Sequence, residues 1–355
     1  MRLHSLRLAL LATLIATPFM PAQDDMMMTP PKELGRYEKL VGNWEGDGLV
    51  RASADEDPVK WTAHSTCKKV LGGWAYQEDM RIDLAMEGAP PLIFRSYYGY
   101  DQATKQYRVM SFSNAGSPSM QRILWAEDNL IVGSQSMMEE GQSVTETWRT
   151  RFATKDLYIF RIERAVAGAS PFLHVNGGMR RGGKGFEVTP STVKLAMAAP
   201  DPAMKRLRDD SGVWILRKGS VVPMPGMAAM PVSGKETISR ILGGHIQMGH
   251  IVGDPAPGSP FVYEGYVYMG WSDQDNCYKS FTLSNSGEFM VEDARILDDG
   301  SVVFVSTGVL AGQPMANRTI LRYQKNGSAM HIRTTRLVGT SKPEFSFEGF
   351  FEKSK

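Results

Sequence analysis

Residues that commonly carry chemistry are scarce in this sequence. Its 355 residues include two cysteines and six histidines. The chain has no Gly-x-Ser-x-Gly elbow, no phosphate-binding loop and no His-Glu-x-x-His pair, which are motifs of common hydrolases and metalloenzymes. Zinc requires three or four converging ligands, and no such spacing occurs. Acids such as Glu78, Asp79 and Asp83 are expected on solvated strand faces. We therefore predict that the protein is not an enzyme and carries no cofactor.

An excess of charge of one sign is also lacking. The chain has 40 Lys and Arg residues against 38 Asp and Glu residues, and loss of an N-terminal segment containing Arg2 and Arg7 leaves 38 of each. Nucleic acids and anionic membranes attract proteins with a basic surface. This balance gives no electrostatic reason to predict either partner.

Long hydrophobic runs are missing except near the N-terminus. Two arginines there accompany an apolar stretch over residues 8–16, and Ala22 follows as a small residue suited to cleavage. Nine apolar residues cannot cross a bilayer core of ~30 Å, whereas this order of features is typical of a signal peptide. We predict a signal peptide over 1–22, a leader over 23–30, and a secreted or periplasmic protein with no membrane insertion after cleavage.

What the sequence does contain is an internal repeat. Leu71-Gly72-Gly73 recurs as Leu242-Gly243-Gly244, and Ser113-Asn114-Ala115-Gly116 recurs as Ser284-Asn285-Ser286-Gly287. Both pairs have the same offset of 171 residues, which indicates two copies of one globular domain rather than a solenoid. We place the domains at 31–181 and 201–355, with a linker at 182–200.

Hydrophobic periodicity predicts an all-β fold for both copies. Each copy begins with a short helix, whose apolar face in copy one is formed by Leu34, Tyr37 and Val41, and continues with Gly-x-Trp. Beyond the tryptophan, apolar residues alternate in short runs separated by turn sequences such as Asn326-Gly327, the pattern of strands joined by hairpins. An antiparallel sheet of about 8–10 strands closes into a barrel and so removes its edges.

Several segments resemble one bacterial family. Leu40-Val41-Gly42-Asn43-Trp44-Glu45-Gly46-Asp47-Gly48 is similar to the opening of bacterial calycin-like barrels, and the Leu-Gly-Gly segments and Tyr98-Gly99-Tyr100-Asp101 agree with it. Together they resemble the family known as domain of unknown function 1579, a relative of lipocalins and nitrobindins. The resemblance implies two tandem calycin-like antiparallel β-barrels. In copy two Leu216 and Lys218 replace two glycines, so we expect its first strand to curve differently.

Aromatic residues beside the shared turn are the candidates for ligand binding. A barrel of this size holds one small ligand or fills itself with side chains, and rings with polar tips suit an amphipathic ligand. Core packing explains the rings equally, and a turn held by side-chain hydrogen bonds explains the asparagines. The candidates are Trp44, Tyr98, Tyr100, Phe112 and Asn114 in copy one and Trp214, Tyr266, Tyr268, Trp271 and Asn285 in copy two. The resemblance implies that the two Gly-x-Trp tryptophans close the barrel floor.

We predict an exported protein that binds a small apolar or amphipathic molecule. One alternative is Cu(I) handling by Met224, Met227 and Met230, because thioethers are soft ligands that prefer this ion. Another alternative is an interaction scaffold with filled barrels. Haem binding through a late histidine, as in nitrobindins, is disfavoured because His331 has no counterpart in copy one. The sequence leaves the ligand and the oligomeric state open.

The two cysteines do not belong to the repeat. At the offset of 171 residues, Cys67 faces Ile238 and Cys277 faces Gln106, so a disulfide within one repeat is excluded. An oxidising compartment would permit a bridge between the domains. Two separately buried thiols would instead pack as small apolar side chains, and the sequence leaves both arrangements open.

Overall fold

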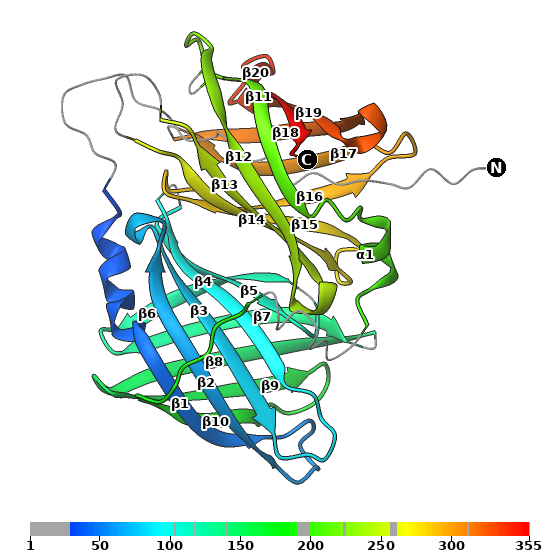
Figure 1. Ribbon diagram of the computed structural model, residues 1–355. Coiled ribbons are helices and arrows are strands. Elements are labelled where there is room, and N and C mark those ends of the chain that lie inside the picture. Colours follow the sequence, from blue (N-terminus) through cyan, green and yellow to red (C-terminus); the bar gives the residue numbers. More distant parts are fainter. Residues whose placement is uncertain are drawn as a thin grey trace. The chain divides into compact units, whose positions relative to one another are not determined.

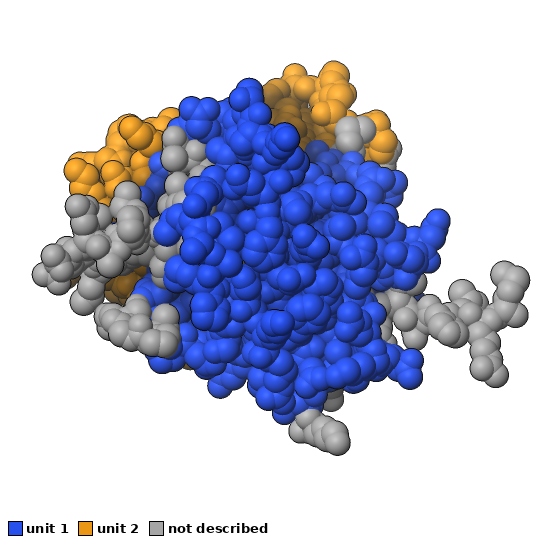
Figure 2. All heavy atoms as spheres, turned by 90° about the horizontal axis from the view of Figure 1, so that it is seen from above, with its two compact units in different colours: residues 1–30, 101–104, 200–355 blue, residues 31–100, 105–199 orange. Residues whose placement is uncertain are grey.

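The computed structural model describes residues 29–102, 104–116, 118–139, 141–189, 199–222, 225–255, 261–310 and 312–354. Over these residues the chain forms two closed barrels, each of ten antiparallel strands (Figure 1). The prediction of two tandem all-β barrels is therefore confirmed, while the predicted signal peptide lies outside the described residues. The chain divides into two compact units. One comprises residues 31–100 and 105–199, shown in orange in Figure 2, and contains barrel 1. The other comprises residues 200–355 together with 1–30 and 101–104, shown in blue, and contains barrel 2.

The two barrels have the same order of elements. Barrel 1 follows the 3₁₀ helix η1 (Lys32–Leu40), and barrel 2 follows the helix α1 (Pro202–Arg206). The strands of barrel 1 are β1 (Gly42–Val50), β2 (Val59–Val70), β3 (Ala75–Leu84), β4 (Leu92–Asp101), β5 (Gln106–Ser113), β6 (Ser119–Glu127), β7 (Leu130–Glu139), β8 (Gln142–Thr154), β9 (Leu157–Val166) and β10 (Phe172–Arg181). Those of barrel 2 are β11 (Gly212–Val221), β12 (Met230–Ile241), β13 (Ile246–Gly253), β14 (Glu264–Ser272), β15 (Cys277–Ser284), β16 (Phe289–Ile296), β17 (Val302–Leu310), β18 (Gln313–Gln324), β19 (Ala329–Val338) and β20 (Glu344–Lys353).

Each barrel is an up-and-down meander closed by its first and last strands. β1 pairs with both β2 and β10, and β11 pairs with both β12 and β20. Closure pairs the strand edges that an open sheet would leave exposed. Because successive residues of a strand point to opposite faces, every second residue faces the interior, and the register identifies equivalent positions in the two barrels.

The repeated Leu-Gly-Gly segment forms a tight turn in both barrels. It is the 3₁₀ turn η2 (Leu71–Gly73) between β2 and β3, and η4 (Leu242–Gly244) between β12 and β13. Gly72 has φ 64° and Gly243 has φ 68°, in the left-handed region that glycine adopts at little cost. The geometry of the turn therefore accounts for the recurrence of this segment.

The helix η1 contributes to the core of barrel 1. Its buried side chains are Leu34, Tyr37 and Leu40. Val41, which the sequence predicted on the same apolar face, follows directly after the helix and packs against this core as a partly buried residue. The Tyr37 ring lies 5.9 Å from the Trp125 ring inside the barrel. The helix thus closes one end of the interior.

The Gly-x-Trp tryptophans form the floor of each barrel at the helix end. Trp44 and Trp214 are both 0% exposed. Trp44 Nε1 donates to Leu40 O (2.6 Å), and Trp214 Nε1 donates to Asp210 O (2.8 Å). The Arg181 guanidinium lies 4.4 Å from the centre of the Trp44 ring. These contacts give both tryptophans the structural role that the resemblance implies.

Glycines of barrel 1 make room for one inward-facing tryptophan. A Cβ at Gly48 would lie 2.5 Å from Cζ2 of Trp61, and a Cβ at Gly177 would lie 2.6 Å from Cη2 of the same ring. In barrel 2 the first strand carries larger residues, and its register with β20 shifts between Leu216 and Lys218. A β-bulge accommodates such residues by bending the strand, so the different course expected for β11 is confirmed.

We expect Gly177→Ala to destabilise barrel 1 by about 1–3 kcal/mol, because the new methyl group overlaps the Trp61 ring and the Asp47 carbonyl oxygen. Gly178→Ala is the matched control. A Cβ at Gly178 comes no closer than 3.6 Å to its neighbours, and we expect a change within ~0.5 kcal/mol. Urea unfolding followed by circular dichroism measures both variants. Equal stability of the two would contradict the space-filling role of Trp61.

Both cysteines are free and buried. Cys67 belongs to the core of barrel 1, and Cys277 is the first residue of β15 in barrel 2. Burial raises the pKa of both thiols, and that of Cys67 lies well above its usual range. The structure therefore supports two separately buried thiols rather than a disulfide.

Part of the segment predicted as a linker packs against barrel 1. Val188 N donates to Asp79 Oδ2 (2.9 Å), and Arg95 Nη2 donates to Val188 O (3.1 Å). Arg95 also donates to both oxygens of Asp79, each at 2.7 Å. Asp79 is 1% exposed, which corrects the expectation of a solvated acid. Residues 186–188 therefore form a docked strap on the outer face of barrel 1.

Candidate functional site

The two barrels differ in how far solvent reaches their interiors. Ser96 and Ser111 face into barrel 1 and are half-buried. The equivalent residues of barrel 2 are Val267 and Thr282, which are 0% and 1% exposed. The same contrast holds for other pairs of equivalent positions toward the end opposite the helix. Barrel 1 thus keeps a solvent-accessible interior at that end, whereas the equivalent interior of barrel 2 is closed to solvent.

We define the accessible interior as the half-buried residues that face into barrel 1 above its floor. They include Met80, Ile82, Leu84, Phe94, Ser96, Tyr98, Ser111, Gln121, Gln135, Glu146, Trp148, Phe160, Ile162, Arg164 and Val175. Among them, Phe160 stacks on the buried Trp61 ring, with the two ring centres 5.5 Å apart. Aromatic and aliphatic walls with a few convergent polar groups are typical of small-molecule sites.

A chain of hydrogen bonds crosses the accessible interior from β6 to β8. Trp148 Nε1 donates to Gln121 Oε1 (2.8 Å), and Gln121 Nε2 donates to Gln135 Oε1. Gln135 Nε2 in turn donates to Glu146 Oε2 (2.8 Å). Each N–H in the chain points toward the next residue, so the chain ends on the Glu146 carboxylate. Such a network fixes the positions of all four side chains.

Arg164 on β9 lies beside that carboxylate. Its Nη1 donates to Glu146 Oε1 (3.4 Å), and its Nη2 donates to Glu139 Oε2. His174 Nε2 lies 3.9 Å from Glu146 Oε1. The side chains of Arg164, Glu146 and His174 are 15%, 13% and 17% exposed. This charged group therefore sits at the open end of the accessible interior, partly in contact with water.

A buried carboxylate lies beneath the accessible interior. Tyr98 Oη donates to Glu78 Oε2 (2.7 Å), and Ser65 Oγ donates to Glu78 Oε1 (3.0 Å). Burial raises the pKa of Glu78, and the two hydrogen bonds reduce that rise. Glu78 is 5% exposed, so the expectation of a solvated acid is wrong here too. Its hydrogen bond holds the predicted ligand residue Tyr98 in place.

Barrel 2 carries polar residues at the same positions, but they are buried. In register, Gln121, Gln135, Glu146 and Arg164 correspond to Glu292, Ser306, Asn317 and Arg336. Ser306 Oγ donates to Glu292 Oε1 (2.9 Å), and Asn317 Nδ2 donates to Ser306 Oγ (3.5 Å). Burial raises the pKa of Glu292 to about 7. Glu292, Ser306 and Asn317 thus bond to one another within the buried interior of barrel 2.

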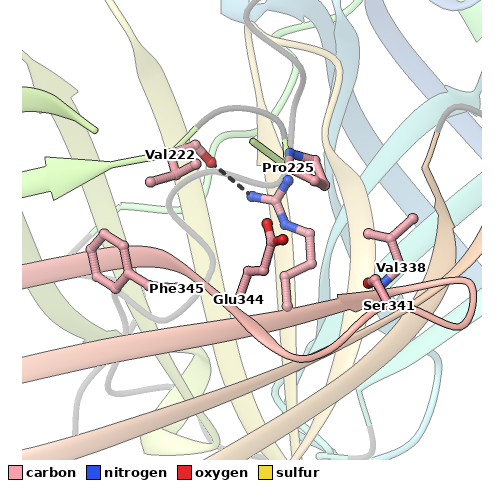
Figure 3. Close-up of a pocket in the computed structure, with 7 residues that line it drawn as sticks. Val222, Pro225, Val338, Ser341, Glu344 and Phe345 are labelled. Atoms are coloured by element: carbon pink, nitrogen blue, oxygen red, sulfur yellow. Dashed lines mark hydrogen bonds between the residues drawn. The ribbon is translucent and has the colours of Figure 1, made fainter. Parts of the chain in front are cut away.

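One small pocket of barrel 2 lies where β11 and β19 end and β20 begins. Figure 3 shows Val222, Pro225 and Glu344 around it, and Arg336 Nη2 donates to Val222 O (3.2 Å). The pocket has a volume of about 10 Å³, close to the space that one water molecule needs. An organic ligand does not fit there.

The predicted aromatic residues divide between the two faces of the barrels. Tyr98 and Tyr100 pack toward the interior of barrel 1, and Trp271 packs toward the core of barrel 2. The alternation of β14 turns Tyr266 and Tyr268 to the outer face. Phe112, which alternates with the inward-facing Ser111, also faces outward. These three outward residues do not line an interior, so their contact with a ligand stays a prediction.

The shared asparagines hold the turn before β4 and β14. Asn114 Nδ2 donates to Pro91 O (2.8 Å), and Asn114 Oδ1 accepts from Ile93 N (2.8 Å). Asn285 makes the same pair of bonds to Val262 O (2.7 Å) and from Glu264 N (2.9 Å). The turn thus accounts for both asparagines.

The methionines predicted as an alternative copper site are described only in part. Met224 lies outside the described residues, Met227 is half-buried, and Met230 packs against the core of barrel 2. In the part of the chain that the structure describes, no group of three or more His, Cys, Asp or Glu residues could hold a metal ion. Within the same residues, no helix is long and apolar enough to cross a bilayer.

The sequence missed the polar group of the accessible interior. Gln121, Gln135 and Glu146 have different residue types at the equivalent positions of copy two, so the comparison of copies did not mark them. Arg164 does have an arginine counterpart, Arg336, but at an offset of 172 residues. An alignment that allowed one inserted residue before β19 would have paired them.

No protein-family model matches this sequence, and no curated protein matches it. Among solved structures, the chain is similar to the Rv2717c protein from M. tuberculosis, with 12% identity, coverage of 44% of this chain and 100% of that chain, and a TM-score of 0.34. It is similar to an S-type phycobiliprotein lyase from Guillardia theta, with 11% identity, coverage of 46% and 100%, and a TM-score of 0.32. A DUF3598-family protein of unknown function from Nostoc punctiforme has 10% identity, coverage of 91% and 100%, and a TM-score of 0.26.

These similarities carry no argument about a ligand or an activity, because the identities and TM-scores are low. Two ten-stranded barrels in tandem fit a calycin-like repeat. The finer resemblance to domain of unknown function 1579 stays a prediction.

Proposed function

We propose that this protein is an exported, non-catalytic binding protein that holds one small amphipathic molecule inside barrel 1. Barrel 2 serves as a filled structural module. The observation that carries the proposal is the difference in solvent access at equivalent interior positions. Ser111 of barrel 1 is half-buried, for example, whereas Thr282 of barrel 2 is buried. Transfer of apolar ligand surface from water to the walls of barrel 1 contributes ~25 cal/mol per Å². The polar group at the open end suits the other, polar part of such a molecule.

The sequence supports the remaining parts of the proposal. The apolar stretch over residues 8–16 supports export. The Gly-x-Trp opening and the Leu-Gly-Gly turns support membership of the family known as domain of unknown function 1579. The balance of charges supports a small molecule rather than nucleic acid as the partner.

Ser111→Phe tests the proposal by filling the accessible interior. The neutral fluorophore N-phenyl-1-naphthylamine is titrated into the mature protein and its variants. We expect Ser111→Phe to weaken binding of the probe by about tenfold or more, because the new ring occupies the space of the ligand. Ser134 on β7 is exposed on the outer face, so Ser134→Phe is the matched control and leaves the affinity unchanged.

Two results overturn the proposal: failure of the wild type to bind the probe, or equal affinity of the wild type and Ser111→Phe. Thermal unfolding shows whether each variant is folded. Ser96 on β4 also faces inward, with its Oγ 3.0 Å from Ser111 Oγ. Ser96→Phe therefore replaces Ser111→Phe if the latter does not fold.

A further inference from the structure

The charged side chains at the open end of barrel 1 indicate which charge the bound molecule carries. This inference rests on the proposed function, the binding of a small molecule in barrel 1. Among the described residues of the accessible interior, only Arg164 is basic, and Glu146 and Glu139 both accept its hydrogen bonds. With His174 neutral, two carboxylates face one guanidinium and leave a net negative charge. With His174 protonated the charges balance. In neither state does this group of four side chains carry a net positive charge.

Arg164 is poorly placed to anchor an anion. Its Nη1 and Nη2 already donate to two different carboxylates, and its side chain is 15% exposed. An anionic ligand would have to displace one carboxylate and leave that charge unpaired in a partly buried position, which is unfavourable. The guanidinium instead holds Glu139 and Glu146 together at the open end.

Glu146 retains capacity to accept a further hydrogen bond. The hydrogen-bond chain that begins at Trp148 and continues through Gln121 and Gln135 ends on Glu146, where Gln135 Nε2 donates to Oε2 at 2.8 Å. The other oxygen has only the longer contact of 3.4 Å with Arg164 and lies 3.9 Å from His174. An ionised carboxylate offers about four acceptor positions, so a ligand donor finds room there.

Aromatic rings surround the same space. Trp148 faces inward two residues from Glu146 on β8, and the Trp61 and Phe160 rings stack further along the wall. Aromatic faces attract ammonium groups through their quadrupole. We propose that the molecule bound in barrel 1 is an organic cation, an amphipathic amine whose ammonium group hydrogen-bonds Glu146 and whose apolar part lies against these rings.

Three fluorescent probes test the sign of the charge on the mature, full-length protein. Dansylcadaverine carries a free ammonium group, 11-(dansylamino)undecanoic acid carries a carboxylate, and N-phenyl-1-naphthylamine is neutral. We expect dansylcadaverine to bind at least about tenfold more tightly than the acid. An acid probe that binds as tightly as the amine, or more tightly, overturns the proposal.

Glu146→Gln tests the residue. We expect it to weaken binding of dansylcadaverine about tenfold and to leave binding of the neutral probe unchanged, because it removes one charge at nearly constant volume. Glu163 on β9 is the matched control, since its side chain faces outward and is 46% exposed; Glu163→Gln changes neither affinity. Equal losses for both probes overturn the assignment of Glu146.

Glu139→Gln provides a second variant if Glu146→Gln does not fold, because Glu139 is 43% exposed. We expect it to weaken binding of dansylcadaverine about threefold, through the field of the charge it removes; no loss overturns the proposal. Failure of this inference differs from failure of the proposed function. In the first case the neutral probe still binds and Ser111→Phe still blocks it; in the second, the neutral probe itself does not bind or is not blocked.

Discussion

Asp79→Asn is expected to destabilise barrel 1 by about 3–5 kcal/mol, because it leaves the buried Arg95 guanidinium without its charge partner. Arg95 donates to both carboxylate oxygens at 2.7 Å, and Val188 N donates to the same group at 2.9 Å. The substitution therefore weakens the docked strap as well as the barrel. Urea unfolding measures the loss, and hydrogen exchange at the Val188 amide reports release of the strap.

The neighbouring pair of Arg81 and Asp83 provides the control. It lies on the same strand and has an Nη2 to Oδ1 distance of 2.7 Å, but its side chains are 36% and 40% exposed. Exposed pairs contribute about 0–1 kcal/mol, so Asp83→Asn has a small effect. The double variant Asp79→Leu with Arg95→Met removes both buried charges and recovers much of the lost stability. A loss for Asp79→Asn no larger than that for Asp83→Asn would contradict this account.

Barrel 2 is expected to lose stability as the pH rises from about 4.5 to about 7. Burial raises the pKa of Glu292 to about 7 in the folded protein, from an ordinary value of 4.5. The unfolded chain therefore releases this proton at lower pH than the folded barrel does, so a rising pH favours unfolding. The difference corresponds to about 3 kcal/mol of stability that is present below pH 4.5 and lost above pH 7.

Glu292→Gln removes this pH-dependent loss of stability, because the amide stays neutral at every pH. We expect the variant to be about 2–3 kcal/mol more stable than the wild type at pH 8 and to show a flatter pH profile. Hydrogen-exchange mass spectrometry of peptides from β16 to β18 measures the opening free energy in barrel 2 itself. Asp293→Asn, at the adjacent outward position with 62% exposure, is the control that keeps the wild-type profile. An unchanged profile for Glu292→Gln would contradict the prediction.

The architecture could be predicted because the features that build it recur in both copies. Trp44 and Trp214 close the floors, and the Leu-Gly-Gly turns need a left-handed backbone that few residues adopt. Hairpin sequences such as Asn326-Gly327 marked the strand ends, and β18 and β19 do meet at that turn. Local backbone geometry restricts residue type strongly, so the sequence alone shows it.

The site could be predicted only in part because interior chemistry does not recur. Tyr98 and Tyr100 were identified, but Glu146 has Asn317 as its equivalent, so the comparison of copies could not reveal it. The two barrels also bury carboxylates on different strands. Glu78 lies on β3 of barrel 1, whereas barrel 2 buries Glu236 on β12. Which strand supplies a charge depends on packing across the barrel, and that information is not local in the sequence.

Burial of the two thiols has a consequence for redox chemistry. Thiol–disulfide exchange proceeds through the thiolate and requires access to the sulfur. Cys67 is 1% exposed and Cys277 is 4% exposed, and burial raises the pKa of each. Burial thus favours the unreactive protonated form of both thiols. The folded chain is therefore expected to resist formation of mixed disulfides, and unfolding makes its cysteines available to glutathione or to an oxidoreductase.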